Sequence, residues 1–547
     1  MVQDYSLAVN SYTKNLIDGL IPKRIIPFDF YEERDIDRDV RDWIQDGGRD
    51  FAVILGDAGM GKTNLLCKLA DELIKGGQFA VFFVKSENLI DERFDENILN
   101  NLDLKGPGLN LTSVLEVISA AGRRIIFLLD TLDVIAIDKG IVRLEQFLTT
   151  FRKDGRIVLG TSRPLEYRKI ENLANKTFEL KPFSDTEVGR LFDKYKAYYQ
   201  MTGVELRQPI LEVCRNPLHM RMLFEVYQPN EIPEDISTQL LYDRYWQRKV
   251  GEIRQGALSH LDAGKKNAAT DLKEKLAKRI ATEMFTSGKI TLEIARLDSI
   301  MGELAGKRLS IRQVAVVEGS RNVKVDQSVK DITIESSTLV NDAWMDLRDE
   351  GVLREQNKRI EFFHQSFFEY ATGRSIIEED KRKREIWIKR LLDDITSLEN
   401  RAIIQQVILQ ARIREEQEIA QRFLERLSRH DTYTKMLAID LLRRIGNLTE
   451  KEIEIYQSLT NDIKINRYLA ESLRWIILKH PGLALGLMET LSKDRRKAVR
   501  SVAAEALAEF AELYPQRARF LVEELKGVEN IEIQKAIEGI LRKGRCQ

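Results

Sequence analysis

One short segment, Phe51 to Thr63, has the residue types and the spacing needed to bind a chain of phosphates. It reads FAVILGDAGMGKT, so an apolar strand runs directly into the pattern G-x-x-x-x-G-K-[ST]. Glycines let successive backbone N–H groups face an anion, and the following helix adds the positive end of its dipole. Lys62 can reach the outer phosphates, and Thr63 can offer its hydroxyl to Mg²⁺. We therefore predict a site for ATP or ADP with Mg²⁺, made by Gly56, Asp57, Ala58, Gly59, Met60, Gly61, Lys62, Thr63 and Asn64.

The segments around this loop predict an α/β domain that would position it. Uniformly apolar strands that alternate with helices are typical of a parallel sheet covered on both faces. Strands are expected at 51–55, 79–84, 124–130, 156–160 and 178–180, and helices at 35–44, 64–75, 111–121, 141–151 and from 185 onward.

Two carboxylates follow the strand RRIIFLLD. Asp130 ends the strand, and ligands of open α/β sheets gather at the carboxyl ends of the strands. We predict that Asp130 binds Mg²⁺ together with Thr63, and that Asp133 polarises the attacking water. The alternative is that either aspartate only caps the loop that follows.

An arginine stands just past the next strand, in the sequence Thr161-Ser162-Arg163-Pro164. Arg163 can reach a γ-phosphate and stabilise its charge, which makes it a candidate catalytic residue beside Lys62, Asp130 and Asp133. A surface arginine in a turn is the alternative.

Bulk composition excludes several classes of function. Lys+Arg and Asp+Glu number 86 each, so no global charge attracts nucleic acid or an acidic membrane. The three cysteines are far apart, which argues against a disulfide framework or structural zinc. Apolar runs such as Ile125 to Leu129 are far below the roughly 20 residues of a membrane helix. We expect a cytoplasmic protein with no membrane contact.

The two ends of the chain are predicted to be helical. Residues 1–25 form one short amphipathic helix, which either packs on the core or binds a partner. From about residue 380 a spacing of about 31 to 34 residues recurs, as expected of paired-helix repeats similar to HEAT repeats. It is marked by Ile439 to Leu442, Ala470 to Leu473, Ala504 to Leu507 and Ile537 to Ile540. The basic cluster Lys493 to Lys497 reads as a turn between helices rather than a nucleic-acid contact.

An ordered set of motifs resembles the NACHT branch of the STAND NTPases, which are relatives of AAA+ proteins. The motifs are GDAGMGKT, IIFLLDTLD, VLGTSRP, FELKPFS, CRNPLHMRML, TQLLYDRYW and FFHQSFFEYATG, and together they cover about residues 25 to 375. The chain departs from the family at Asp130-Thr-Leu-Asp133-Val134, where a small residue and a later acidic pair are usual. This departure argues against rapid hydrolysis more than against nucleotide binding. Together with the resemblance it implies a slow ATPase that is used as a switch.

The resemblance implies roles for two further residues. Pro217 would pack on the adenine, and His364 would touch the β-phosphate of bound ADP from a winged helix. Without the resemblance, Pro217 is better explained as a proline that begins a helix and contacts no ligand. For His364, the alternative that it is a buried core residue stays open. The resemblance also implies an ADP-locked resting state, exchange for ATP after the C-terminal repeats bind a protein ligand, assembly into a homo-oligomer, and a role in defence, including defence against phage. The effector output is expected from a separate protein, from the first helix or from a part outside this sequence.

The predicted fold class is therefore multidomain α/β plus all-α. Its domains are an N-terminal helix (1–25), a P-loop NTPase domain (26–182), a small helical domain (183–255), a helical and winged-helix region (256–378) and a C-terminal α-solenoid (379–547). The segment from Leu309 to Ser337 reads as irregular and has no assigned role. Two other functions stay open: a AAA+ type motor acting on protein or nucleic acid, and a helical scaffold with a structural nucleotide.

Overall fold

The computed structural model divides into two compact units, Met1–Phe368 and Glu369–Gln547. It describes residues 5–20, 30–48, 51–90, 94–102, 109–135, 138–151, 156–201, 204–228, 232–233, 236–253, 263–305, 309–316, 325–332, 337–356, 358–395, 398–445, 448–459, 462–513, 522–523 and 531–545. Parts of the predicted N-terminal helix, of the 309–337 segment and of the last repeat lie outside these residues, as does Cys546.

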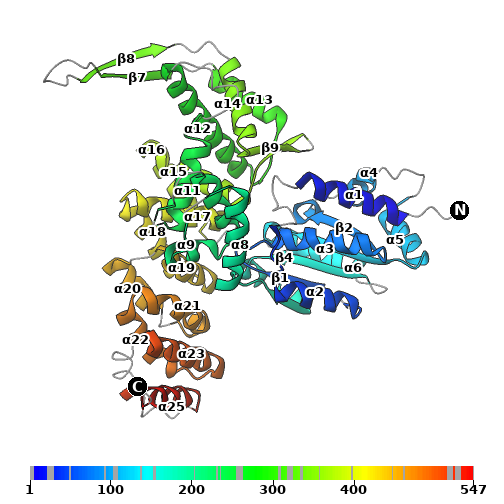
Figure 1. Cartoon of the computed structure of the whole chain (residues 1–547), viewed down its shortest axis with the longest axis vertical. Coiled ribbons are helices and arrows are strands. Elements are labelled where there is room, and N and C mark those ends of the chain that lie inside the picture. Colours follow the sequence, from blue (N-terminus) through cyan, green and yellow to red (C-terminus); the bar gives the residue numbers. More distant parts are fainter. Residues whose placement is uncertain are drawn as a thin grey trace. The chain divides into compact units, whose positions relative to one another are not determined.

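A five-stranded parallel sheet, in the order β2-β3-β4-β1-β5, organises the first part of unit 1 (Figure 1). Because β1 lies between β4 and β5, with β3 on the far side of β4, the carboxyl ends of β1, β3 and β4 are neighbours. The strands are β1 (Phe51–Leu55), β2 (Phe79–Lys85), β3 (Arg124–Asp130), β4 (Ile157–Ser162) and β5 (Lys176–Glu179). The predicted strands are confirmed, although β5 begins two residues before the predicted start, in polar residues that carry no strand signal.

Helices cover both faces of this sheet, as its uniformly apolar strands require. On one face, α2 (Asp35–Gln45) and α3 (Lys62–Gly76) bury their apolar side chains against alternate strand residues. On the other face lie α4 (Phe94–Asn101), α5 (Leu111–Ala120) and α6 (Asp138–Phe151). Short helical turns at Ser86–Ile90, Leu132–Ile135, Glu171–Leu173 and α7 (Pro164–Tyr167) complete the connections.

The first helix, α1 (Tyr5–Leu20), covers the outer edge of the sheet. Its Asn10 amide donates to the Phe79 carbonyl at 2.8 Å and accepts from the Val81 N–H at 2.9 Å. The Thr13 hydroxyl donates to the Val81 carbonyl at 2.6 Å and accepts from the Phe83 N–H at 3.4 Å. Two side chains thus supply the hydrogen bonds that a further strand would make with β2, and they protect an edge that would otherwise invite pairing. Of the two roles expected for this helix, packing on the core is the one observed.

Removing these edge contacts should destabilise the NTPase domain. Thr13→Val keeps the shape of the side chain but leaves buried groups of β2 unpaired, at a cost of about 1–3 kcal/mol. We expect a lower free energy of unfolding in urea, together with more self-association in sedimentation. Asn15→Ala on the exposed face of the same helix is the control and should change neither. Equal stability of Thr13→Val and the wild type would contradict a capping role.

The rest of unit 1 is mainly helical. A helical segment of α8 (Asp185–Tyr198), α9 (Gln208–Cys214), α10 (Pro217–Tyr227) and α11 (Thr238–Lys249) follows the sheet. Next come α12 (Ala263–Thr286), α13 (Ile294–Ala305) and α14 (Ser337–Asp349), with a small antiparallel sheet of β6 (Leu292–Glu293), β9 (Leu353–Gln356) and β10 (Arg359–Phe362). These elements lie in the region for which a winged helix is predicted, and that assignment stays a prediction.

The 309–337 segment differs from the irregular structure that we expected. It contains two antiparallel strands, β7 (Leu309–Val316) and β8 (Val325–Ile332), which pair along their whole length. Polar and charged residues occur on both alternating sets of positions in each strand, for example Arg312 and Gln313. No period of two therefore marks these strands in the sequence.

Unit 2 is a stack of helices, entered through α15 (Gln365–Glu378). The positions of the predicted repeat fall on α19, α21, α23 and α25, and each of these helices packs on the next. The helices are α16 (Lys381–Asp393), α17 (Leu398–Ile413), α18 (Gln417–Ser428), α19 (Thr432–Ile445), α20 (Glu450–Leu459), α21 (Asn466–Lys479), α22 (Pro481–Ser492), α23 (Lys497–Leu513) and α25 (Ile531–Arg545). None of the helices in the described ranges is long and apolar enough to cross a membrane.

Part of the basic cluster at the start of α23 forms contacts within the fold. Arg496 forms an ion pair with Asp494 at 3.0 Å, and Asn466 donates to the same carboxylate at 2.7 Å. The Arg496 guanidinium, together with the Asn466 amide, holds the pKa of Asp494 at about 2. Arg500 donates to the carbonyls of Asp494 and Arg495. These contacts favour the turn that the sequence predicts.

Candidate nucleotide-binding site

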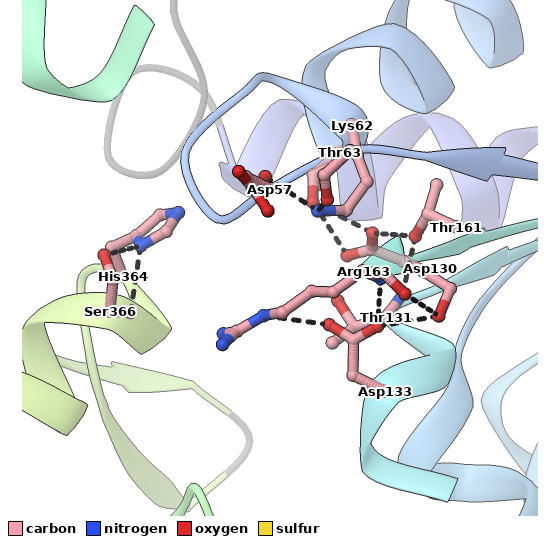
Figure 2. A network of polar contacts seen from close by, with 12 residues as sticks. Asp57, Lys62, Thr63, Asp130, Thr131, Asp133, Thr161, Arg163, His364 and Ser366 are labelled. Atoms are coloured by element: carbon pink, nitrogen blue, oxygen red, sulfur yellow. Dashed lines mark hydrogen bonds and ion pairs between the residues drawn. The ribbon is translucent and has the colours of Figure 1, made fainter. Parts of the chain in front are cut away.

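The predicted phosphate-binding loop connects β1 to α3. Gly59 and Gly61 have φ of +82° and +91°, in the left-handed region that glycine adopts without strain. The Lys62 ammonium donates to the carbonyl oxygens of Gly56 and Asp57 at 2.6 and 3.0 Å (Figure 2). Burial lowers the pKa of Lys62, while the nearby Asp133 carboxylate favours its charged form. The lysine therefore lies inside the loop, where phosphate oxygens can replace the carbonyl oxygens as acceptors.

Asp130 and Thr63 place their side-chain oxygen atoms next to each other beside the loop. The Thr63 hydroxyl is 2.9 and 3.1 Å from the two carboxylate oxygens of Asp130, and the Thr161 hydroxyl is 3.2 Å from one of them. Mg²⁺ is usually held by one or two protein oxygens together with phosphate and water, so this pair fits the ion. Among the described residues, no group of three or more His, Cys, Asp or Glu side chains could hold a metal.

Backbone strain occurs directly after Asp130. Thr131 has φ of +64°, which is uncommon for a residue with a branched side chain. Its N–H donates to the Thr161 hydroxyl at 2.8 Å, and this bond connects the ends of β3 and β4. Strain of this kind persists only where the surroundings enforce it, and it often marks functional sites.

Asp133 and Arg163 form a buried ion pair at the end of β4. The Arg163 Nε is 3.2 Å from an Asp133 carboxylate oxygen, and both side chains are less than a tenth exposed. The same carboxylate accepts from the Arg163 N–H at 2.6 Å and from the Ser162 hydroxyl at 3.0 Å. Asp133 thus orients the guanidinium in this arrangement. Its predicted role as a base toward water stays a prediction.

The start of α10 packs directly on the phosphate-binding loop. Asn216 donates to the Ala58 carbonyl at 2.9 Å, and the Leu218 N–H donates to the Gly59 carbonyl at 3.3 Å. Pro217 takes the first position of the helix and lines the same pocket as the loop. Pro217 thus begins a helix that borders the predicted nucleotide site, and its packing on the adenine stays a prediction.

Arg221, one turn further along α10, adds a cation to this wall. It is 2.7 Å from Glu225, and the Tyr245 hydroxyl donates to Glu225 at 2.9 Å. Burial alone would raise the pKa of Glu225, but the Arg221 guanidinium holds it below the usual value. The Glu225 carboxylate is therefore ionised at neutral pH. It orients the Arg221 guanidinium, although Glu225 itself does not line the pocket.

His364 approaches from the segment between β10 and α15. Its Nδ1 accepts from the Ser366 N–H at 3.1 Å and is 2.7 Å from the Ser366 hydroxyl, which accepts from the Tyr242 hydroxyl at 2.9 Å. Since Nδ1 accepts a hydrogen bond, the neutral ring carries its proton on Nε2. Figure 2 shows that the ring faces the side of the loop that bears Asp57. The opposite nitrogen can therefore donate to an anion held by the loop.

These segments enclose one pocket. Its lining combines most of the predicted residues with four that we did not predict: Ala58, Gly59, Gly61, Lys62, Thr63, Asn64, Thr131, Asp133, Arg163, Pro217, Leu218, Arg221, His364 and Gln365. The predicted residues outside the lining are Gly56, Asp57, Met60 and Asp130. Met60 belongs to the core beneath the loop, and Asp130 lies behind Thr63.

Three residues that support the site were missed at the level of sequence: Arg34, Asn216 and Arg221. Arg34 donates to the Met60 carbonyl at 2.9 Å and to the Lys181 carbonyl at 3.2 Å, and it stacks 4.3 Å from the centre of the Phe183 ring. It stands in the charged run EERDIDRD, where no local pattern distinguishes it. Asn216 precedes a helix-starting proline, so its capping position was a usable signal.

Comparison with known proteins identifies this region. Residues 50–199 match the family model of the NACHT domain. Among solved structures, the chain is similar to the Aeropyrum pernix ORC1 protein in complex with DNA (14% identity, 65% of this chain and 95% of that one, TM-score 0.31). It is also similar to Cdc6p from Pyrobaculum aerophilum (16% identity, 66% of this chain and 98% of that one, TM-score 0.25). A further similar structure is C. elegans PCH-2 (12% identity, 43% of this chain and 73% of that one, TM-score 0.28). No curated protein matched the chain.

With the phosphate-binding loop, the parallel sheet and this match in agreement, residues 50–199 of the chain form a NACHT domain, a nucleotide-binding P-loop NTPase module.

Proposed function

We propose that the chain is a nucleotide-gated switch, in which ADP joins the NACHT domain to the helical segment and to His364 at rest. The observation that carries this proposal is the composition of the pocket. Its lining comes from the phosphate-binding loop, the ends of β3 and β4, the start of α10 and the residues around His364. A nucleotide bound there would contact five segments that are separate in the sequence.

Differential contacts supply the switching energy. Lys62 would bind phosphates in either nucleotide, His364 would donate to the β-phosphate of ADP, and Arg163 would contact the γ-phosphate of ATP. A ligand shifts a conformational equilibrium only by its difference in affinity for the two states, so a phosphate that engages different segments changes which packing is favoured. Thr63 and Asp130 would hold Mg²⁺, which would neutralise charge between the phosphates.

The wider role follows the NACHT resemblance. The helical repeats of unit 2 would bind the activating protein ligand, and the ATP-bound form would assemble into a homo-oligomer that signals to a separate effector protein. Hydrolysis would be slow and would reset the switch, with Lys62, Asp133 and Arg163 in the catalytic group. Defence against phage is one setting for such a switch.

The test is to identify the nucleotide that copurifies with the chain by mass spectrometry, and then to follow particle mass after ATP and Mg²⁺ are added. We expect bound ADP in a monomer, followed by exchange and assembly. Steady turnover at about 1 to 1000 per second would contradict the switch and favour a motor. Bound ADP that never exchanges, with no assembly, would contradict it and favour a scaffold.

A further inference from the structure

Every carbonyl of the phosphate-binding loop has a hydrogen-bond donor. When successive N–H groups of a loop face an anion, the carbonyls between them face outward and need donors of their own. The donors are Lys62 for Gly56 and Asp57, Asn216 for Ala58, the Leu218 N–H for Gly59, Arg34 for Met60 and the Leu65 N–H for Gly61. Two consecutive carbonyls in the middle of the loop are thus held by the start of α10.

Asn216 performs two tasks with one side-chain amide. Its oxygen accepts from the N–H groups of Leu218 and His219, at 3.0 and 3.4 Å, and so caps α10. Its nitrogen donates to the Ala58 carbonyl at 2.9 Å. These partners determine the orientation of the Asn216 amide. The N–H groups of α10 need the amide oxygen as an acceptor, and the Ala58 carbonyl needs the amide nitrogen as a donor. Asn216 is 7% exposed, so water does not compete freely for either bond.

The loop fits this contact closely. A Cβ added at Gly59 would lie 2.6 Å from the Asn216 side-chain oxygen and 2.9 Å from the Leu218 Cβ. The lack of a side chain at Gly59 thus allows α10 to pack closely on the loop, in addition to allowing the turn of the loop. Shape and hydrogen bonding both join this helix to residues that face the phosphates.

We propose that Asn216 is a positioning residue that couples the helical segment to the phosphate-binding loop, so that nucleotide release and departure of α10 from the loop favour each other. The inference rests on the proposed nucleotide site and specifies how that site is regulated. The N–H groups of the loop would hold the phosphates while its carbonyls hold α10, so each contact stabilises the loop shape that the other needs. Such coupling is reciprocal between the two sites.

The test compares variants that separate the two tasks of the amide. Asn216→Ser keeps a capping hydroxyl but loses the donor to Ala58, and Asn216→Asp keeps a full capping carboxylate but repels that carbonyl. Stopped-flow release of a fluorescent ADP analogue from the full chain measures the effect. Losing one neutral hydrogen bond of about 0.5–1.5 kcal/mol corresponds to release about 2- to 13-fold faster. We expect this for Asn216→Ser, and at least as large an effect for Asn216→Asp.

A matched control is available at another helix. Asn110 caps α5 and accepts from the Ser113 N–H at 2.9 Å, and none of the pocket-lining residues belongs to that helix. Asn110→Ser should leave release unchanged. If Asn216 acted only as a cap, Asn216→Asp would release the analogue at the wild-type rate, and this result would overturn the inference while leaving the proposed function intact. Lys62→Ala is expected to bind no analogue. If the wild-type chain also bound none, that result would overturn both the inference and the proposed function.

Discussion

Replacing Lys62 with alanine is expected to abolish measurable binding of ATP and ADP. The ammonium is buried inside the loop, so its deletion removes the one side-chain cation that the loop itself supplies to the phosphates. Charge-assisted hydrogen bonds contribute about 1.5–3 kcal/mol each, and two such bonds correspond to a loss of affinity of about 100-fold or more. The carbonyls of Gly56 and Asp57 would also lose their shared donor. Isothermal titration with each nucleotide in the presence of Mg²⁺ measures the effect.

Lys68 provides the control, because it stands on the same helix and forms an ion pair with Glu72 at 3.5 Å. Lys68→Ala should bind both nucleotides with wild-type affinity, and circular dichroism should show that both variants keep their helical content. Tight binding by Lys62→Ala would mean that the nucleotide lies elsewhere, and the proposed switch would then have no basis.

The sheet and the phosphate-binding loop were predictable because their signals are local. A run of apolar residues before Gly56 indicates a buried strand, and glycine, lysine and threonine at set distances indicate the loop. Asp130 and Arg163 also follow strands directly, so a parallel sheet brings them to the same edge. The position of each residue at the end of a predicted strand was therefore enough to group these residues at one edge of the sheet.

The support around the loop was not predictable in this way. Arg34 reaches Met60 across 26 positions, and Asn216 reaches Ala58 across 158, while neither belongs to a pattern that implies its partner. The Asp133 contact with Arg163 was missed for a related reason, since both residues were assigned separate roles toward the nucleotide. Contacts between distant segments depend on how the helices pack, which periodicity does not specify.

The position of His364 depends on its attachment to the rest of unit 1. Strand β10, which leads to it, carries Glu361, and this carboxylate is 3.4 Å from Lys85 at the end of β2 and 2.8 Å from Arg354. On the other side, the Tyr242 hydroxyl donates to Ser366. An ion pair to the sheet and a hydrogen bond to α11 thus hold the histidine at the pocket. A nucleotide contact at His364 would add to these bonds between segments.

His364→Ala is therefore expected to release ADP about 10- to 100-fold faster than the wild type, and to assemble without added ligand. In the proposed resting state the ring would donate from Nε2 to a phosphate of ADP, and a hydrogen bond to a charged group contributes about 1.5–3 kcal/mol. Tyr242→Phe, which removes only the hydroxyl that orients Ser366, should give a smaller increase. Release of a fluorescent ADP analogue and light scattering measure the two effects.

Exposed His430, in unit 2, supplies the matched substitution, and His430→Ala should behave as the wild type in both measurements. The graded order of the three variants distinguishes a phosphate contact from a general loss of stability, because a loss of stability would lower the melting temperature in proportion to the release rate. Unchanged ADP release by His364→Ala would show that the histidine packs beside the pocket without holding the nucleotide, and the resting state would then need a different lock.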